Sequence, residues 1–139
     1  GPERSSIESQ ISFLGLDTCV RLLGRRDDVT ELLQMLDLFA FPSRSEGNPN
    51  ALLEAMAVGV PVVASDIPGN NLLVEHSVTG YRVAVDSAEE LARGILTLAF
   101  DKEAQCRQVT AAKSLIADYY SLDKIVMQYE AFYCNLRRD

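Results

Sequence analysis

Two spacings of apolar residues alternate along the chain, and they predict strands and helices in turn. Two short runs, 38–41 and 61–64, are apolar throughout, which is typical of strands buried on both faces of a parallel sheet. Shorter β-favouring stretches lie at 20–23 and 81–85. The sequence predicts a strand in each segment, with 38–41 and 61–64 adjacent, parallel and joined by the helix between them.

Apolar residues at helical spacing predict helices between these strands. The first helix is capped by Ser5 or Ser6 and ended by Gly15, and the second is capped by Asp27 or Asp28. The segment 51–58 is apolar nearly all round, which predicts a buried helix. The remaining helices are expected at 72–75, at 88–100 with Asp86 or Ser87 as the cap, at 103–117 and at 122–136.

Strands that alternate with helices predict an α/β fold, in which helices cover an open parallel sheet of the Rossmann-like kind. The chain has 139 residues, a length that favours one domain. In such sheets a ligand binds at the carboxyl ends of the strands. We therefore expect functional residues in the loops that follow Phe41 and Ala64.

The charge balance argues against nucleic acid as a partner. The chain has 13 Lys and Arg residues, 20 Asp and Glu residues and a formal net charge of −7, so most of its surface repels a phosphate backbone. The basic clusters Arg25-Arg26 and Arg137-Arg138 are too short to form the basic stripe of a nucleic-acid-binding protein.

The cysteines and the lengths of the apolar runs indicate the expected cellular location of the protein. Cys19, Cys106 and Cys134 are odd in number and widely spaced, which favours reduced thiols over a disulfide framework or a zinc site. No apolar run is long enough to span a bilayer, and the first residues lack the layout of a signal peptide. The expected location is cytoplasmic, and any membrane contact would be peripheral.

The loop after Phe41 and the helix that follows it carry the candidate chemistry. Glu46 lies in the loop and Glu54 lies about one turn inside the helix. Backbone amides at the helix start can hold an anion, while carboxylates accept hydrogen bonds from hydroxyl groups. A diphosphate attached to sugars fits both requirements.

Several motifs in a fixed order give this region a recognisable pattern. F-P-S ends the strand at 41–43, E-G-N-P-N-A-L-L-E-A begins the helix at 46–55, G-V-P-V-V-A-S-D covers 59–66, and T-G-Y follows at 79–81. The chain resembles the C-terminal, nucleotide-sugar-binding domain of retaining GT-B glycosyltransferases of the family 4 type. Their signature is two glutamates separated by seven residues, which Glu46 and Glu54 match.

The resemblance implies a role for each matched residue. Glu46 would be catalytic, because it would bind the donor sugar and stabilise positive charge as the bond to phosphate breaks. Glu54 would hold the ribose hydroxyls. The other implied donor contacts are Gly47, Asn48, Pro49, Asn50, Ala51, Arg25 and Arg26. Local readings stay open, because Gly47 also suits a turn, Asn48 and Asn50 suit helix caps, Pro49 suits the first helical position and the arginines suit a surface pair.

The implied reaction is hexosyl transfer from a UDP- or GDP-sugar in polysaccharide or glycolipid biosynthesis. It needs no tightly bound cofactor and no metal, since D-x-D is absent and the single histidine, His76, is expected in an exposed turn. The alternatives are a non-catalytic nucleotide or sugar-phosphate binding module, a GT-B phosphorylase or epimerase, and a structural interaction domain.

Two parts of the family's pattern have no counterpart here: the first two strand–helix units of the domain and the N-terminal domain that binds the acceptor. The 139 residues are therefore expected to form a partial donor domain that is inactive alone. Without the first strand, 20–23 and 38–41 lose their common neighbour. They could pair directly, pair with another copy, or receive the missing segment from elsewhere, so self-association is an open possibility.

Overall fold

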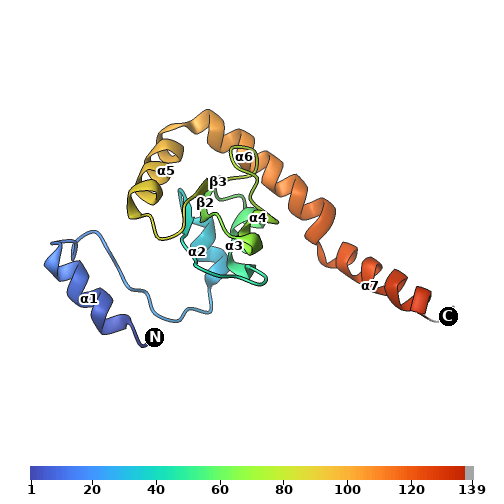
Figure 1. Ribbon diagram of the computed structural model, residues 1–139, viewed down its shortest axis with the longest axis horizontal. Helices are drawn as coiled ribbons and strands as arrows, with labels where there is room; N and C mark the ends of the chain where they lie inside the picture. The colour runs from blue at the N-terminus through green and yellow to red at the C-terminus, as the bar shows by residue number, and fades with distance from the viewer. Residues whose placement is uncertain (137–139) are drawn as a thin grey trace.

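The computed structural model describes residues 1–136 and shows a parallel sheet covered by helices (Figure 1). The sheet has three strands in the order β1 (Phe39–Phe41), β2 (Val62–Ser65) and β3 (Tyr81–Val83), all parallel. Phe39 lies opposite Val62, and Val63 lies opposite Tyr81. The predicted α/β class is confirmed. Arg137 and Arg138 lie outside the described residues.

The middle strand, β2, is buried along its whole length. Val62 and Ala64 face a core formed with α3 (Asn50–Val58) and α6 (Lys102–Leu115). Val63 faces the opposite core, which α5 (Ala88–Phe100) covers. This alternation is what a strand between two helical layers requires, so the prediction for 61–64 is confirmed with a shift of one residue.

The prediction that 38–41 is buried on both faces is wrong, although its parallel pairing with β2 is confirmed. All three residues of β1 are only half-buried. Within the described residues β1 is at one end of the strand order, so no strand covers its outer side. The apolar composition of β1 therefore predicts more burial than the structure shows.

The strand expected at 20–23 is also wrong, because these residues form no strand and three of the four are exposed. A strand needs a hydrogen-bonding neighbour, and within residues 1–136 this segment has none. The helix before it, α1 (Arg4–Phe13), starts before Ser5 and buries no residue. In Figure 1, α1 and the segment after it lie apart from the sheet.

Most of the other helices lie where they are expected. α2 (Val29–Gln34) follows Asp28, whose side chain makes no capping bond. Gly59 ends α3 in the left-handed region at φ +95°, as its glycine predicts. Ser87, and not Asp86, caps α5 by accepting a hydrogen bond from the Glu90 N–H at 3.2 Å.

Two helical boundaries differ from the expectation. The short helix expected at 72–75 is α4 (Pro68–Asn71), because Pro68 provides a pre-set first helical residue. The helix expected at 103–117 ends at Leu115 and passes into a π-helical turn, η1 (Ile116–Tyr120). α7 (Leu122–Leu136) then extends away from the sheet (Figure 1).

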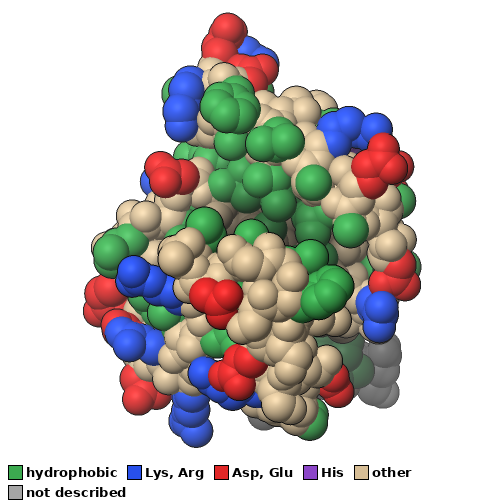
Figure 2. Space-filling view, turned by 90° about the vertical axis from the view of Figure 1, so that its left-hand side faces the viewer, with side chains coloured by type: hydrophobic (Ala, Val, Ile, Leu, Met, Phe, Trp, Pro, Cys, Tyr) green, Lys and Arg blue, Asp and Glu red, His purple; other side chains and the backbone are tan. Residues whose placement is uncertain are grey.

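The surface that contains α1 and α5 is mixed in character. Figure 2 shows hydrophobic side chains gathered in the upper half of this face, with charged side chains along its edges and across its lower half. Leu96 and Phe100 of α5 and Phe13 and Leu14 near the end of α1 are among the exposed hydrophobic residues. In the described part of the chain, no helix has the length and apolar character needed to cross a membrane.

Candidate functional site

The loops after β1 and β2 meet at the carboxyl ends of the strands. The loop after β1, residues 42–49, contains Glu46, and the segment after β2 leads into α4. The contact is so close that a Cβ on Gly69 would lie 2.3 Å from the Glu46 carbonyl oxygen. The two loops that the sequence singles out therefore form one surface.

Two carboxylates belong to this surface and its helix. Glu46 is half-buried in the loop, and Glu54 is exposed in the second turn of α3. Within residues 1–136, no ion pair or hydrogen bond engages either side chain. Both carboxylates are thus free to accept hydrogen bonds from the hydroxyl groups of a ligand.

The start of α3 has no side-chain cap and no acidic residue in its first turn. Pro49 is buried and lies just before the helix, not at its first position as expected. In the described structure, the Ala51 N–H has no hydrogen-bond partner. An uncapped helix start with a free N–H favours an anion.

The asparagines on either side of Pro49 differ from the expectation in one respect. The backbone amides at the helix start are expected to hold an anion, but the Asn50 N–H donates to the Asn48 carbonyl at 2.9 Å. The Asn48 side chain donates to the Asn50 side-chain oxygen at 2.8 Å. The two residues form a tight turn that orients the helix start, and the Asn50 backbone amide is already used.

Neither the backbone conformation nor the packing at position 47 requires a glycine. A Cβ on Gly47 would meet nothing within 4 Å, and its φ lies outside the left-handed region that favours glycine. The backbone bends at Gly47, so the turn interpretation stays open, although neither its φ nor its surroundings require a glycine. The open space beside it leaves room for a ligand to approach the main chain.

Arg25 and Arg26 lie on the segment between α1 and α2, where both are exposed. Arg26 donates to Asp28 at 2.7 Å, and this hydrogen bond raises the pKa of Arg26 and lowers the pKa of Asp28. Arg25 lies 4.0 Å from Asp27. Within residues 1–136, no ion pair joins either arginine to the loop 42–49.

Two polar contacts that the sequence did not single out hold the site's loops. The Asn70 side chain is fully buried, and its Nδ2 donates to the Ser65 carbonyl at the end of β2, at 2.9 Å. Arg44 donates to Asp86 at 2.6 Å, linking the loop after β1 to the turn after β3 and raising the pKa of Arg44. The only signal for Asn70 was its place in P-G-N-N after a buried strand.

Comparison with known proteins places this chain in a family. Residues 1–101 match the model of the family described as Glycosyl transferases group 1. The chain belongs to this family. The resemblance to GT-B glycosyltransferases that the motifs indicated is therefore confirmed.

The chain is similar in sequence to two bacterial enzymes. The group 1 glycosyltransferase domain is 34% identical to N-acetyl-alpha-D-glucosaminyl L-malate synthase of Bacillus anthracis over 139 residues, which cover 100% of this chain and 36% of the relative. It is 36% identical over 81 residues to UDP-Gal:alpha-D-GlcNAc-diphosphoundecaprenol alpha-1,3-galactosyltransferase of Escherichia coli, covering 58% of this chain and 21% of that enzyme.

Among solved structures, HepE of Anabaena in complex with UDP-glucose has the same fold. The TM-score is 0.89 at 30% sequence identity, and the match covers 94% of this chain and 36% of HepE. The chain thus spans about 36% of the length of the Bacillus anthracis enzyme and of HepE.

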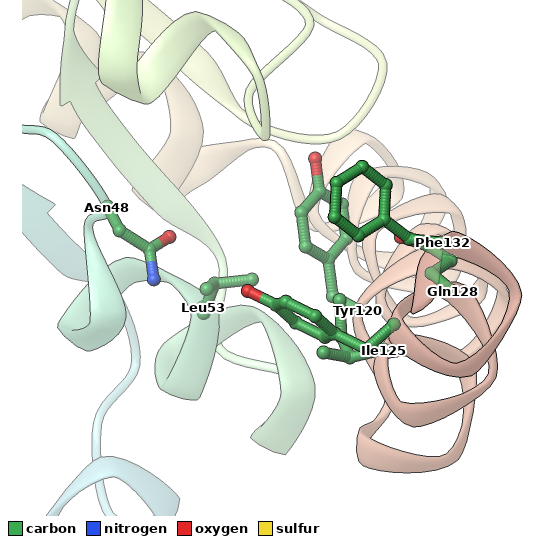
Figure 3. Close-up of a pocket in the computed structure, with 7 residues that line it drawn as sticks. Asn48, Leu53, Tyr120, Ile125, Gln128 and Phe132 are labelled. Atoms are coloured by element: carbon green, nitrogen blue, oxygen red, sulfur yellow. The ribbon is translucent and has the colours of Figure 1, made fainter. Parts of the chain in front are cut away.

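A cavity lies beside the loop of the group 1 glycosyltransferase domain that contains Glu46. It has a volume of about 640 Å³ and lies between Asn48 and Leu53 on one side and η1 and α7 on the other. Figure 3 shows Asn48 and Leu53 facing Tyr120, Ile125 and Phe132 across it. The Tyr120 hydroxyl donates to the Leu72 carbonyl at 3.3 Å, which holds the end of η1 against the segment after α4.

The T-G-Y turn and His76 have structural roles in this domain. Thr79 is buried, and its hydroxyl donates to the Leu73 carbonyl and accepts from the Glu75 N–H, both at 2.8 Å. His76 is exposed as expected, and its Nδ1 accepts from the Arg82 N–H at 3.0 Å. These contacts shape the connection from α4 to β3.

The remaining candidate ligands are scattered. In the part of the chain that the structure describes, no three His, Cys, Asp or Glu side chains lie together as a metal site. Cys19, Cys106 and Cys134 are exposed and free.

Proposed function

We propose that this chain is the donor-binding part of a glycosyltransferase that transfers a hexose from a nucleotide sugar with retention of configuration, as family 4 enzymes do. Residues 1–139 would form one partial domain of the full-length protein. The observation that carries the proposal is the uncapped start of α3, with the Glu46 carboxylate in the loop before it and the Glu54 carboxylate in its second turn. Within the described residues neither carboxylate has a protein partner. The crystal structure of HepE with UDP-glucose favours a UDP-sugar over a GDP-sugar.

The proposed chemistry follows from the charges at this site. The diphosphate lies at the start of α3, where the Ala51 N–H and the helix dipole stabilise the charge that develops on the leaving group. Glu46 binds the sugar and stabilises the positive charge on its anomeric carbon. No step needs a metal or another cofactor.

The remaining residues bind the donor or shape its binding site without entering the reaction. Glu54 accepts hydrogen bonds from the ribose hydroxyls, while Gly47 gives the donor access to the main chain. Asn48, Pro49 and Asn50 form the turn that sets the direction of α3. Arg25 and Arg26 contact the base, and Arg26 must exchange part of its contact with Asp28 to do so.

The acceptor is proposed to bind outside this chain. The Escherichia coli relative is named for an acceptor linked to diphosphoundecaprenol. By analogy, we infer a role in glycan or glycolipid biosynthesis, in the cytoplasm and with peripheral contact to a membrane. The open outer side of β1 suggests that the isolated chain associates with itself, which analytical ultracentrifugation of the 139-residue chain can measure.

A nucleotide-sugar panel tests the proposed function. The full-length protein is titrated by calorimetry with UDP, GDP and their glucose, N-acetylglucosamine, galactose and mannose derivatives, and release of the nucleotide is followed. We expect one donor to bind and to be turned over, with retention visible in the NMR spectrum of the product. Binding without turnover for every donor, with acceptor extracts present, supports the non-catalytic binding module instead.

A further inference from the structure

We propose that Gly69 is a positioning residue for Glu46: it lets the loop after β1 rest on α4 and so fixes where the Glu46 carboxylate meets the donor. This inference rests on the proposed role of Glu46. It adds to the site a residue that follows a different strand, and this residue acts through its lack of a side chain.

The contact between the two loops is made by backbone atoms. A Cβ on Gly69 would lie 2.3 Å from the Glu46 carbonyl oxygen, 2.9 Å from its carbonyl carbon and 3.1 Å from its Cβ. All three atoms belong to the same residue. Because two of them are backbone atoms, they cannot move aside without moving the loop.

The backbone conformation at position 69 does not require a glycine. Its φ lies outside the left-handed region, and it occupies α4 just after Pro68, where an alanine would be well tolerated by the helix itself. The steric requirement for a glycine therefore comes from the neighbouring Glu46.

The segment that contains Gly69 is partly buried and is joined to β2 by a hydrogen bond. Gly69 is buried, and the next residue, Asn70, is fully buried and donates from Nδ2 to the Ser65 carbonyl at 2.9 Å. Ser65 is the last residue of β2, the middle strand of the sheet. The position of Glu46 is thus fixed to the centre of the fold through Gly69, Asn70 and Ser65.

Gly69→Ala in the full-length enzyme tests the proposal, because the added methyl must push the Glu46 backbone away from α4. A shift of about 1 Å in a reacting group can cost ~10²-fold in rate, so we expect kcat to fall by about 10-fold or more, with a smaller change in the donor KM.

The matched control is Gly80→Ala. A Cβ on Gly80 would lie 2.5 Å from Val62 Cγ2 and 3.1 Å from the Val62 carbonyl oxygen, at the amino ends of β2 and β3. Its φ also lies outside the left-handed region. This variant also adds a buried methyl group that clashes with its neighbours, but it meets the Val62 side chain first and lies at the opposite end of the sheet. The folded enzyme should therefore keep its kcat. Thermal unfolding of both variants gives the folded fraction, to which each rate is normalised.

A double-mutant cycle separates positioning from general damage. If Gly69 acts through Glu46, then Gly69→Ala should lower kcat by less than about 2-fold once Glu46→Gln is already present. Should Gly69→Ala fail to fold, Asn70→Ala takes its place in the same cycle, because it removes the bond that fixes α4 to β2. The same loss of effect in the Glu46→Gln background is expected.

The outcomes distinguish this inference from the proposed function. A Gly69→Ala enzyme with the kcat of Gly80→Ala, or one that loses about 10-fold again on top of Glu46→Gln, overturns the positioning role. A Glu46→Gln enzyme with normal turnover overturns the catalytic role of Glu46 itself and, with it, the basis of this inference.

Discussion

Glu46 and Glu54 belong to one loop and helix, yet the proposal gives them different kinetic consequences. Glu46 is half-buried and acts on charge that develops only as the glycosidic bond breaks. Glu46→Gln in the full-length enzyme should therefore lower kcat by ~10²-fold or more, with a smaller effect on donor binding. Steady-state kinetics with varied donor measures both quantities. Glu103→Gln, which removes a carboxylate from an exposed pair with Arg107, serves as the control and should be active.

Glu54 should show the opposite pattern. Its contacts with the ribose hydroxyls exist before and during the reaction, so their loss weakens the ground state and the transition state alike. Glu54→Gln should raise the donor KM by an amount equivalent to ~1–3 kcal/mol and leave kcat nearly unchanged. A large fall in kcat at saturating donor would move Glu54 into the catalytic machinery.

At the residue scale, local motifs indicated the candidate site, and the structure adds non-local contacts to it. The two glutamates and the helix start are continuous in sequence, so their association could be predicted. The contact of Gly69 with Glu46 joins loops after different strands, and no spacing in the sequence encodes it. The bond from the Asn50 N–H to Asn48 was missed because it depends on the turn geometry around Pro49.

At the scale of elements, one buried hydroxyl contributes two hydrogen bonds to the turn between α4 and β3. Thr79 is buried and bridges the Leu73 carbonyl and the Glu75 N–H. Thr79→Val keeps the shape but leaves both groups without this partner, so it should lower the free energy of unfolding by ~1–3 kcal/mol. Thr110→Val, at an exposed position of α6, is the matched control and should change it by less than about 0.5 kcal/mol. Urea unfolding of the full-length variants compares the two, and equal losses would contradict the role of Thr79.

The elements also show what a hydrophobic pattern can and cannot determine. The pattern at 61–64 predicted a buried strand. The prediction is confirmed because β2 has a partner strand on each side within this chain. The pattern at 20–23 predicted a strand that does not form, since a strand depends on neighbours that composition does not reveal. Pro68 moved the start of the helix expected at 72–75, because proline favours the first helical position. The helix at 88–100 begins where it was predicted, with Ser87 as its cap.

At the scale of the whole molecule, the chain covers 36% of the Bacillus anthracis relative, and the proposal places the acceptor outside it. The isolated 139 residues should bind the donor more weakly than the full-length enzyme and show no transfer. The reason is that the groups that stabilise charge in the transition state must already be in place, and the proposal places part of the active site outside this chain. Calorimetry and a transfer assay on the two proteins, side by side, test this. Turnover by the isolated chain at the rate of the full-length enzyme would require a new assignment of the acceptor site.

The measurement that tests the central claim most directly is hydrogen–deuterium exchange of the full-length protein, with and without a saturating concentration of the donor that the panel identifies. The claim is that the nucleotide sugar lies at the start of α3, where the Ala51 N–H has no partner within the described residues. The donor should slow exchange in peptides that cover 46–54 and leave those from 102–115 of α6 unchanged. Unaltered exchange in 46–54 under a donor that the enzyme binds and turns over would contradict the claim.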